Sequence, residues 1–243
     1  MKNDKNLSVE QTFNLAIQNH KEDKTDIAKN YYQKVLEIDP NHLVTLNNLG
    51  VIFRELGENQ KAKECYEKVI KINPNHVNAH NNLGVIFQEL GELQKAKECY
   101  EKVIKINPNY VNALNNIGII FKELRKNQEA KEYFKKAIEI DPNYADAHNN
   151  LGNIFQELIE NQKAKSCYEK AIKIDPNHVL AHWNSHGQSS SIDEALLILK
   201  KLYKIDNNHI KSKITISALE GYKGNFKMFD EILASSDSNH PIT

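Results

Sequence analysis

The stretch that decides the fold is residues 43–76, LVTLNNLGVIFRELGENQKAKECYEKVIKINPNH, which residues 77–110 repeat with few changes. The same pattern returns more loosely before and after these two copies. Five of the six prolines mark its period, because they lie thirty-four residues apart, at Pro40, Pro74, Pro108, Pro142 and Pro176. A period of this length predicts a repeat protein in which each copy buries its apolar face against the next copy.

Within one copy, the apolar residues have helical spacing and fall into two groups. Leu49, Gly50 and Phe53 share one face of a first helix, and Ala62 and Tyr66 share one face of a second helix. A glycine inside a helix costs about 1 kcal/mol relative to alanine. Because glycine recurs here in four successive copies, we expect it to allow close approach to the alanine of the paired helix.

The segment between copies has its own pattern. The proline cannot continue a helix, because it lacks a backbone N–H and restricts the residue before it. An asparagine follows the proline in successive copies, and we expect it to cap the next helix: Asn75, Asn109, Asn143 and Asn177. On the second helices, Glu64 with Lys68 and Glu98 with Lys102 have the spacing of weak surface ion pairs.

This frame resembles the tetratricopeptide repeat, a helix-turn-helix unit that stacks into a solenoid. The resemblance implies an all-α, right-handed superhelical solenoid. It divides the chain into an N-terminal tail (1–8), five regular repeats (9–42, 43–76, 77–110, 111–144, 145–178), divergent helical repeats or a C-terminal cap (179–233), and a tail or linker (234–243).

The divergent end keeps some helical signals. Ser191-x-x-Glu194 is a capping box that predicts a fresh helix. Residues 210–222 and 226–233 are expected to form a last hairpin around Gly224. We interpret this end as a cap on the open face of the stack, with a junction to further sequence as the alternative.

The charge of the chain limits its partners. Thirty-two lysines and arginines balance 32 aspartates and glutamates, so no net field attracts nucleic acid or an anionic membrane. The first eight residues are polar, and no apolar run reaches the roughly eighteen residues of a transmembrane helix. We therefore predict a cytoplasmic protein with no nucleic-acid or membrane partner.

The sequence carries no recognisable catalytic signature. It lacks a nucleophile paired with a base, a glycine-rich phosphate loop and a cofactor fingerprint, so we predict no enzyme activity and no cofactor for these residues. Cys65, Cys99 and Cys167 occupy one repeat position without CxxC spacing, which argues against a disulfide or a zinc site.

Histidine is the one alternative with metal chemistry. His178, His182 and His186 would share one helical face, and metal ligation by them is conceivable. Tyrosine or leucine replaces the first two of these in other repeats. We therefore interpret these histidines as packing positions and predict no metal site.

Asparagine keeps step with the repeat at two adjacent positions of the first helix. The second position is asparagine in six copies, at Asn14, Asn48, Asn82, Asn116, Asn150 and Asn184, and the first position in four, at Asn47, Asn81, Asn115 and Asn149. In tetratricopeptide arrays the first helices line a concave groove. The pattern is similar to the asparagine ladder of O-linked N-acetylglucosamine transferases, which holds peptide backbone.

The resemblance implies a peptide-binding site at Asn47, Asn48, Asn81, Asn82, Asn115, Asn116, Asn149 and Asn150. A carboxamide both donates and accepts hydrogen bonds, so it suits a peptide backbone whatever its side chains. Specificity would come from Asn78, Gln88, Glu89, Asn112, Lys122, Glu123, Asp146, Asn153, Gln156 and Glu157. The structural alternative is that each asparagine bonds to its neighbouring repeat.

Phe13 and Trp183 replace the first asparagine at the two ends of the ladder. We expect them to pack against the divergent terminal repeats, with bracketing of a ligand as the alternative.

Together these features predict a module that binds a protein or an extended peptide in its groove. One alternative is the recognition arm of a larger enzyme, such as a glycosyltransferase or methyltransferase, whose catalytic domain lies beyond residue 243. A further alternative is a scaffold that forms homo-oligomers through its end repeats.

Overall fold

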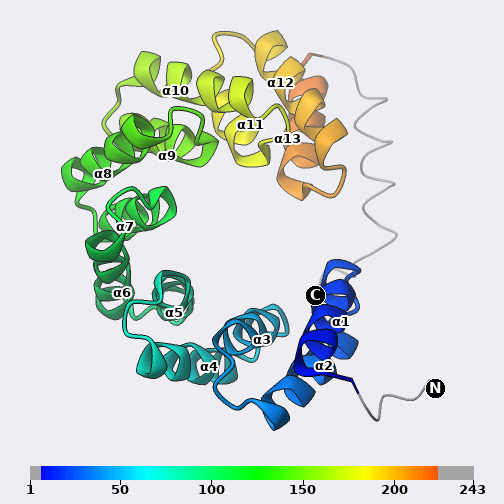
Figure 1. Ribbon diagram of the computed structural model, residues 1–243. Coiled ribbons are helices and arrows are strands. Elements are labelled where there is room, and N and C mark those ends of the chain that lie inside the picture. Colours follow the sequence, from blue (N-terminus) through cyan, green and yellow to red (C-terminus); the bar gives the residue numbers. More distant parts are fainter. Residues whose placement is uncertain (1–6, 224–243) are drawn as a thin grey trace. The chain divides into compact units, whose positions relative to one another are not determined.

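The computed structural model describes residues 7–223, and these form helices and no strand (Figure 1). The helices are α1 (Val9–Lys21), α2 (Thr25–Ile38), α3 (Leu43–Glu55), α4 (Asn59–Ile72), α5 (Val77–Glu89), α6 (Leu93–Ile106), α7 (Val111–Glu123), α8 (Asn127–Ile140), α9 (Ala145–Glu157), α10 (Asn161–Ile174), α11 (Val179–His186), α12 (Ile192–Ile205) and α13 (Ile210–Tyr222). We number the repeats 1 to 6 from α1–α2 to α11–α12. Residues 1–6 of the expected N-terminal tail, the expected helix at 226–233 and the expected tail at 234–243 lie outside the described residues.

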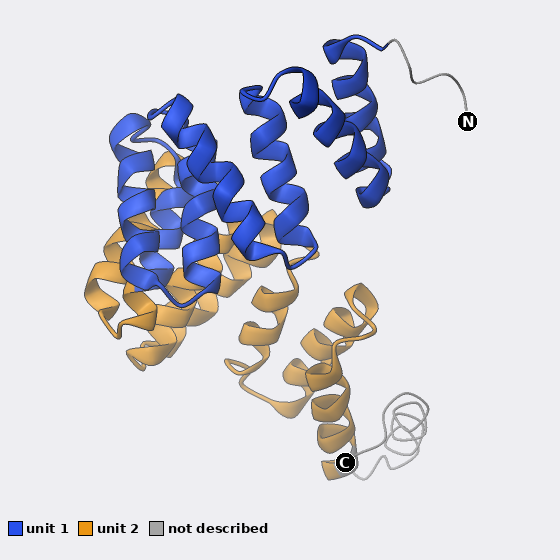
Figure 2. Ribbon diagram, turned by 90° about the horizontal axis from the view of Figure 1, so that it is seen from below, with its two compact units in different colours: residues 1–120 blue, residues 121–243 orange. Residues whose placement is uncertain are grey.

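Packing divides the chain into two compact units, residues 1–120 and 121–243 (Figure 2). In unit 1, α1 packs on α2, α3 on α4 and α5 on α6, and contacts between α2 and α3 and between α4 and α5 join successive pairs. In unit 2, α9 packs on α10 and α11 on α12, joined through α8–α9, α10–α11 and α12–α13. This stacking of helix pairs confirms the predicted all-α solenoid.

The odd-numbered helices share one face within each unit. In unit 1, α3 contacts α5 as well as α4, and in unit 2, α9 contacts α11 as well as α10. We call this the first-helix face, and the side formed by the even-numbered helices the second-helix face. The predicted asparagine pairs belong to the first.

A buried tyrosine explains the glycine of the frame. Tyr66 of α4 and Tyr100 of α6 are completely buried. A Cβ placed on Gly50 would lie 2.6 Å from Tyr66 Cε1, and one on Gly84 would lie 2.7 Å from Tyr100 Cε1. Such distances are shorter than van der Waals contact, so the glycine makes room for the ring. The nearest atoms of the paired helix are therefore those of the tyrosine ring, which the sequence analysis did not anticipate.

The turn inside each repeat requires a left-handed residue, and the repeats fill it differently. Gly57 and Gly91 have φ of 73° and 74°, which costs glycine little. The same position holds Asp23, Arg125 and Ile159, with φ of 56°, 59° and 62°. A branched Cβ crowds the backbone in this conformation. Ile159 is also 82% exposed, so packing does not offset its strain.

Histidine, and not asparagine, caps the first helices of repeats 2, 3 and 6, and in repeat 5 α9 follows Tyr144 without a side-chain cap. The backbone N–H of Asn75 donates to Asn73 Oδ1 over 3.1 Å, while the side chain of His76 caps α5 by accepting from the backbone N–H of Ala79 at Nδ1, also over 3.1 Å. His42 and His178 cap α3 and α11 in the same way. The predicted asparagine caps were therefore wrong, because the helix begins one residue later.

The C-terminal repeats are shorter but still helical. In repeat 6, α11 ends at His186, and Ser191 caps α12 by accepting from the backbone N–H of Glu194 over 3.2 Å. The Glu194 carboxylate accepts from Ser190, not from the cap residue as a full capping box requires. Leu199 and Ile216 belong to one buried cluster that joins α12 to α13.

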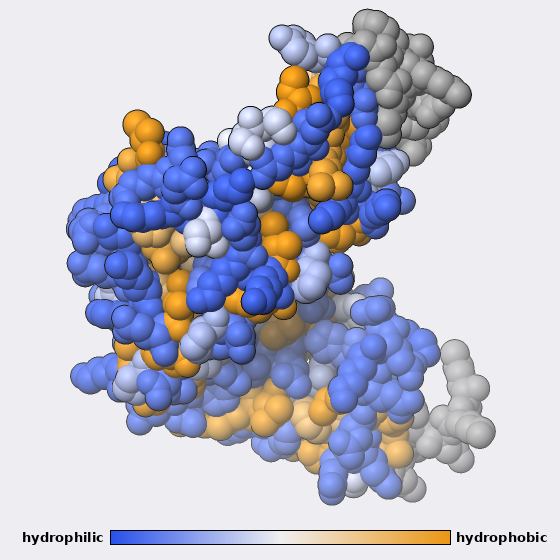
Figure 3. All heavy atoms as spheres, turned by 90° about the horizontal axis from the view of Figure 1, so that it is seen from above, coloured by the Kyte–Doolittle hydropathy of each residue, from blue (hydrophilic) through white to orange (hydrophobic). Residues whose placement is uncertain are grey.

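Polar side chains cover much of the molecular face seen in Figure 3, with hydrophobic residues between them. The ion pairs on the second helices differ from those predicted: Lys63 pairs with Glu67 over 3.8 Å and Lys97 with Glu101 over 3.1 Å. Glu64 and Glu98 instead accept from Gln60 and Gln94. No helix within residues 7–223 is long and apolar enough to cross a bilayer.

Candidate functional site

The two asparagine positions of the first helices differ in burial. Asn48, Asn82, Asn116 and Asn150 are half-buried, whereas Asn115 and Asn149 at the first position are only 4% and 3% exposed. Asn47 and Asn81 are half-buried. The second position is therefore the one that reaches solvent in every regular repeat.

Carboxamides of successive repeats bond to one another. Asn82 Nδ2 donates to Asn47 Oδ1 over 3.4 Å in unit 1. In unit 2, Asn184 Nδ2 donates to Asn149 Oδ1 and to Asn153 Oδ1, each over 2.9 Å. The second asparagine of one repeat thus contacts the first asparagine of the repeat before it.

The second asparagines also contact the buried tyrosines. Asn48 Nδ2 donates to the Tyr32 hydroxyl over 3.3 Å, and the Asn116 side chain is hydrogen-bonded to the Tyr100 hydroxyl. Each of these tyrosines belongs to the repeat before the asparagine. Burial raises the pKa of Tyr32 and of Tyr100 above the ordinary value, so both hydroxyls stay protonated.

The tyrosine hydroxyls also form hydrogen bonds with residues that the sequence analysis proposed for specificity. The Tyr100 hydroxyl donates to Gln88 Oε1 over 3.2 Å. The Tyr168 hydroxyl lies 2.8 Å from both Asn153 Oδ1 and Gln156 Oε1. Gln88, Asn153 and Gln156 therefore have structural partners, as does Asp146, which pairs with His178. Asn78, Glu89, Asn112 and Glu157 are exposed.

Sequence reasoning missed these tyrosines as partners of the ladder. Tyrosine recurs in the phase of the repeat at Tyr32, Tyr66, Tyr100 and Tyr168. A buried tyrosine hydroxyl usually finds a hydrogen-bond partner. The asparagines recur with the same period as the tyrosines, so they were candidate partners. Only the packed structure shows that the tyrosine ring lies against the glycine of its own repeat and that its hydroxyl reaches the first helix of the following repeat.

The histidines hold the segments between repeats. His80 Nε2 lies 2.9 Å from the Pro74 carbonyl oxygen, and His182 Nε2 lies 3.0 Å from that of Pro176. His186 Nδ1 contacts the Trp183 carbonyl. Residues 7–223 contain no group of three or more histidine, cysteine, aspartate or glutamate side chains that could hold a metal ion.

Phe13 and Trp183 pack at equivalent places on the histidine that opens the next first helix. The Phe13 ring lies 5.1 Å from the His42 ring, and the Trp183 ring lies 5.3 Å from the His209 ring, measured between centroids. Trp183 also packs on the buried cluster of α12 and α13. These contacts support the packing interpretation.

The cysteines are free and half-buried. Burial raises the pKa of the Cys65 and Cys167 thiols to about 11 and that of Cys99 to about 12. The thiols are therefore protonated and poor nucleophiles at neutral pH.

Comparison with known proteins agrees with this architecture. Profiles described as tetratricopeptide repeat match residues 13–42, 31–64, 77–110, 111–144 and 145–178, and one described as TPR repeat matches residues 50–91. A 38-residue segment is 45% identical to the uncharacterized protein ycf37 of Pyropia yezoensis. That segment is 16% of this chain and 21% of the ycf37 protein, so the match spans about a fifth of that relative.

Two solved structures illustrate the similarity of the fold. A tetratricopeptide repeat protein from Parabacteroides merdae superimposes with a TM-score of 0.72 at 16% identity, over 95% of this chain and 92% of that one. YrrB, described as a TPR protein with an unusual peptide-binding site, superimposes with a TM-score of 0.53 at 19% identity, over 74% of this chain and 95% of that one. With its helix pairs, its thirty-four-residue period and these matches along residues 13–178, the chain belongs to the tetratricopeptide repeat family, a family of protein-interaction modules.

Proposed function

We propose that this protein binds an extended peptide segment of a partner protein along its first-helix face. The observation that carries the proposal is the column of half-buried asparagines at one position of successive first helices. A carboxamide has two N–H donors and two acceptor lone pairs. The bond from Asn82 to Asn47 uses one donor of Asn82, so capacity remains for a ligand.

The bonds between repeats prepare these side chains for binding. Asn48 and Asn116 are held by the tyrosine hydroxyls beneath them. A side chain already held in one orientation loses less conformational entropy when a ligand arrives. The structural role and the binding role of the ladder are therefore compatible.

The proposal rests on the second asparagine of each pair more than on the first. Asn115 and Asn149 are almost completely buried and so cannot contact a ligand, whereas Asn82, Asn116 and Asn150 reach solvent. One hydrogen bond contributes only about 0.5–1.5 kcal/mol net, so several repeats must act on the same peptide.

The exposed charges next to the ladder favour a basic peptide. Glu89 and Glu157 end the first helices of repeats 3 and 5 and are exposed, while the Asp146 carboxylate already pairs with His178. YrrB, which has the same fold, is a TPR protein with an unusual peptide-binding site, and this supports a peptide as the ligand.

The test separates binding from the structural role of the ladder. Fluorescence anisotropy would measure the binding of a fluorescein-labelled random decapeptide library enriched in lysine to the wild type and to a variant with Asn82→Ala, Asn116→Ala and Asn150→Ala. We expect the variant to lose at least ten-fold in affinity while circular dichroism shows it folded. The matched control, Asn75→Ala with Asn109→Ala, changes exposed asparagines in the segments between repeats and should bind as the wild type does.

Tyr100→Phe provides the second control, because it removes the structural partner of Asn116 and keeps the carboxamide. It should lower stability and weaken peptide binding much less than the triple variant does, because the carboxamide is kept and only its orientation is released. Equal peptide affinity of the triple asparagine variant and the wild type would show that the ladder serves only the fold.

A further inference from the structure

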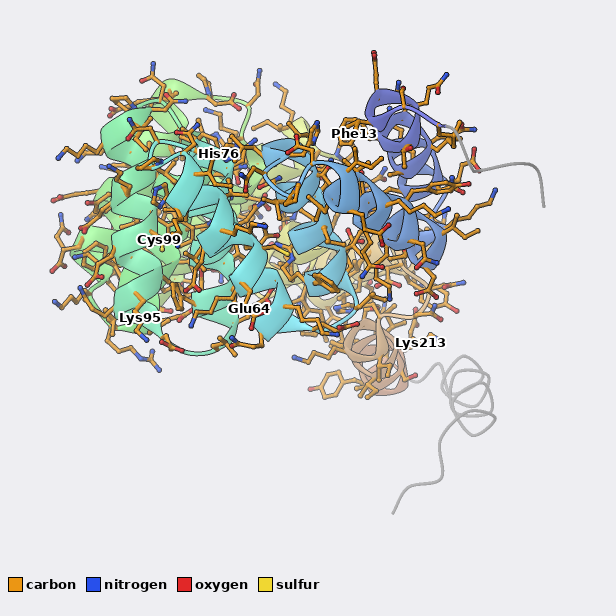
Figure 4. All side chains as sticks on the ribbon, turned by 60° about the horizontal axis from the view of Figure 1, so that its bottom comes forward. Phe13, Glu64, His76, Lys95, Cys99 and Lys213 are labelled. Atoms are coloured by element: carbon orange, nitrogen blue, oxygen red, sulfur yellow. The ribbon has the colours of Figure 1, made fainter. Side chains whose placement is uncertain are left out.

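An apolar cleft lies on the second-helix face of unit 1, between α4 and α6 and above α5. It encloses about 560 Å³. Ile70, Leu83, Phe87 and Cys99 form its apolar surface, and Lys71 and Lys102 are among the charged residues at its rim. In Figure 4, Cys99 and Lys95 lie along α6 beside this cleft.

In repeat 4, a tyrosine side chain occupies the space that corresponds to this cleft. Tyr133 occupies the position of Cys99, thirty-four residues later, and stacks on Phe121, the equivalent of Phe87. The two ring centroids are 5.4 Å apart, with 24° between the ring planes. Above the tyrosine lies Lys136, with Nζ 5.2 Å from the ring centroid. An aromatic ring is thus held between a phenylalanine and an ammonium group.

Repeat 3 has the two outer members of this arrangement without the ring between them. Phe87 is the phenylalanine and Lys102 is the equivalent of Lys136, but Cys99 is too small to fill the space. Repeat 1 repeats the upper half of the arrangement, with Lys34 Nζ 5.0 Å from the Tyr31 ring centroid at the same two positions. Where tyrosine is present, the lysine covers it, and where cysteine replaces it at residue 99, a cleft remains.

The rim carries more positive than negative charge. Lys71, Lys95 and Lys102 line it together with Glu67 and Glu98. Lys71 and Lys102 make no ion pair within the described part of the chain, whereas Glu67 pairs with Lys63 and Lys95 with Glu92. The Glu98 carboxylate accepts from Gln94 and keeps its charge. An ammonium group attracts both an aromatic face and a carboxylate. An aromatic residue next to an acidic one would satisfy both lysines.

We propose that this cleft binds a tyrosine or phenylalanine side chain of a partner protein, flanked in its sequence by acidic residues. The ring stacks on Phe87 in the way that Tyr133 stacks on Phe121, Lys102 covers its outer face, and Lys71 pairs with the neighbouring carboxylate. Lys63 and Lys95, whose Nζ atoms each lie 5.4 Å from the Phe87 ring centroid, move aside. Their ion pairs with Glu67 and Glu92 are surface pairs, and losing such pairs costs little. This surface is separate from the asparagine ladder.

The test uses three labelled pentapeptides with the full chain and measures affinity by fluorescence anisotropy. One has a central tyrosine between acidic residues, one replaces the tyrosine with alanine, and one replaces the acidic residues with lysine. We expect the first to bind at least ten-fold more tightly than either of the others. Equal binding of all three peptides, or no detectable binding of the first, would overturn the proposal.

Variants locate the site. Cys99→Tyr fills the cleft with the ring that repeat 4 supplies for itself and should abolish binding, while Cys167→Tyr, the same change at the equivalent position of repeat 5, should not. Lys71 is exposed and Lys102 is half-buried at the rim; Lys71→Glu and Lys102→Glu should both fold, as circular dichroism would check, and each should weaken binding at least five-fold. The proposal fails if these variants bind as the wild type does. Asn82→Ala should leave binding unchanged, which distinguishes this cleft from the peptide site proposed above.

Discussion

Repeats 2 and 5 share one sequence frame but complete it with different local chemistry. Both place a glycine under a buried tyrosine, Gly50 under Tyr66 and Gly152 under Tyr168. The Tyr168 hydroxyl reaches two acceptors, whereas the Tyr66 hydroxyl is buried without a hydrogen-bond partner. Their turns differ as well, with Gly57 in one and Ile159 in the other. The frame therefore fixes the packing of a repeat, while its hydrogen bonds and strain vary from copy to copy.

The largest effect should come from the feature the two repeats share. Gly152→Ala places a Cβ 2.5 Å from Tyr168 Cε1, and Gly50→Ala does the same under Tyr66. Overpacking of this kind costs about 1–3 kcal/mol. We expect both variants to lower the urea midpoint by similar amounts, measured by circular dichroism.

The control is the same glycine change in a Tyr168→Leu background, where the ring is absent and the added methyl should cost little. An equal cost in both backgrounds would mean that the helix backbone, and not the ring, requires the glycine.

The tyrosine hydroxyls should separate the two repeats. Tyr168→Phe removes a hydroxyl that contacts both Asn153 and Gln156. Asn153 Oδ1 still accepts from Asn184 and Gln156 is exposed, so the change should cost about 0.5–1.5 kcal/mol, the net contribution of one hydrogen bond. Tyr66→Phe removes a buried hydroxyl that has no hydrogen-bond partner, so it should be neutral or stabilising. Thermal unfolding of the two variants, side by side, measures the difference. Equal losses would contradict it.

Exchanging the turn residues should change stability in opposite directions. Ile159→Gly removes left-handed strain from a side chain that is 82% exposed, and should stabilise by about 1 kcal/mol. Gly57→Ile introduces that strain and should destabilise by about 1–2 kcal/mol. The urea midpoints of both variants test this, and Ile159→Val, which keeps the branch, serves as the control. A loss of stability in Ile159→Gly would show that the isoleucine makes a compensating contact.

The smallest effect concerns the histidine that ends each of these repeats. Burial lowers the pKa of His76, while a hydrogen bond to Asp146, with 3.0 Å between His178 Nε2 and Asp146 Oδ1, raises the pKa of His178. The stabilisation from neutral His76 is therefore present above about pH 6.5 and is lost as the pH falls through its lowered pKa. The stabilisation from charged His178 is present below that pH and is lost as the pH rises through its raised pKa.

Urea unfolding at pH 7.5 and pH 5.5 should resolve these opposite contributions. His76→Asn keeps a capping side chain that does not titrate, so this variant should lose less stability on acidification than the wild type. Asp146→Asn removes the partner of His178 and should lose more. The same pH dependence in all three proteins would contradict the assignment.

The sequence indicated the periodic parts of the structure well. The spacing of Leu49 and Phe53 and of Ala62 and Tyr66 predicted two helices per repeat, and proline predicted where each repeat ends. The caps were missed, because asparagine is the commoner capping residue and the histidine beside it was interpreted as packing. Close approach of the paired helix to the glycine was expected, but the tyrosine ring that lies nearest to it was not.

The candidate site was only partly predictable. The fixed phase of Asn48, Asn82 and Asn116 identified a column on one helix face. Which asparagines are buried, and that Asn48 and Asn116 contact tyrosine hydroxyls from the repeat before, follow from packing between helices and not from spacing. The cleft at Cys99 was also outside the reach of sequence reasoning, since a cysteine where another repeat has tyrosine becomes informative only when Phe87 and Lys102 are seen around the space.

By itself, then, the sequence determined the period, the helix pairs and the column of asparagines, because local propensity and side-chain spacing act along the chain. The tertiary structure alone decided which hydroxyl reaches which carboxamide, which turn is strained and where a ring is missing. These depend on distances between atoms of different helices, and a repeated pattern fixes such distances only after the helices have packed.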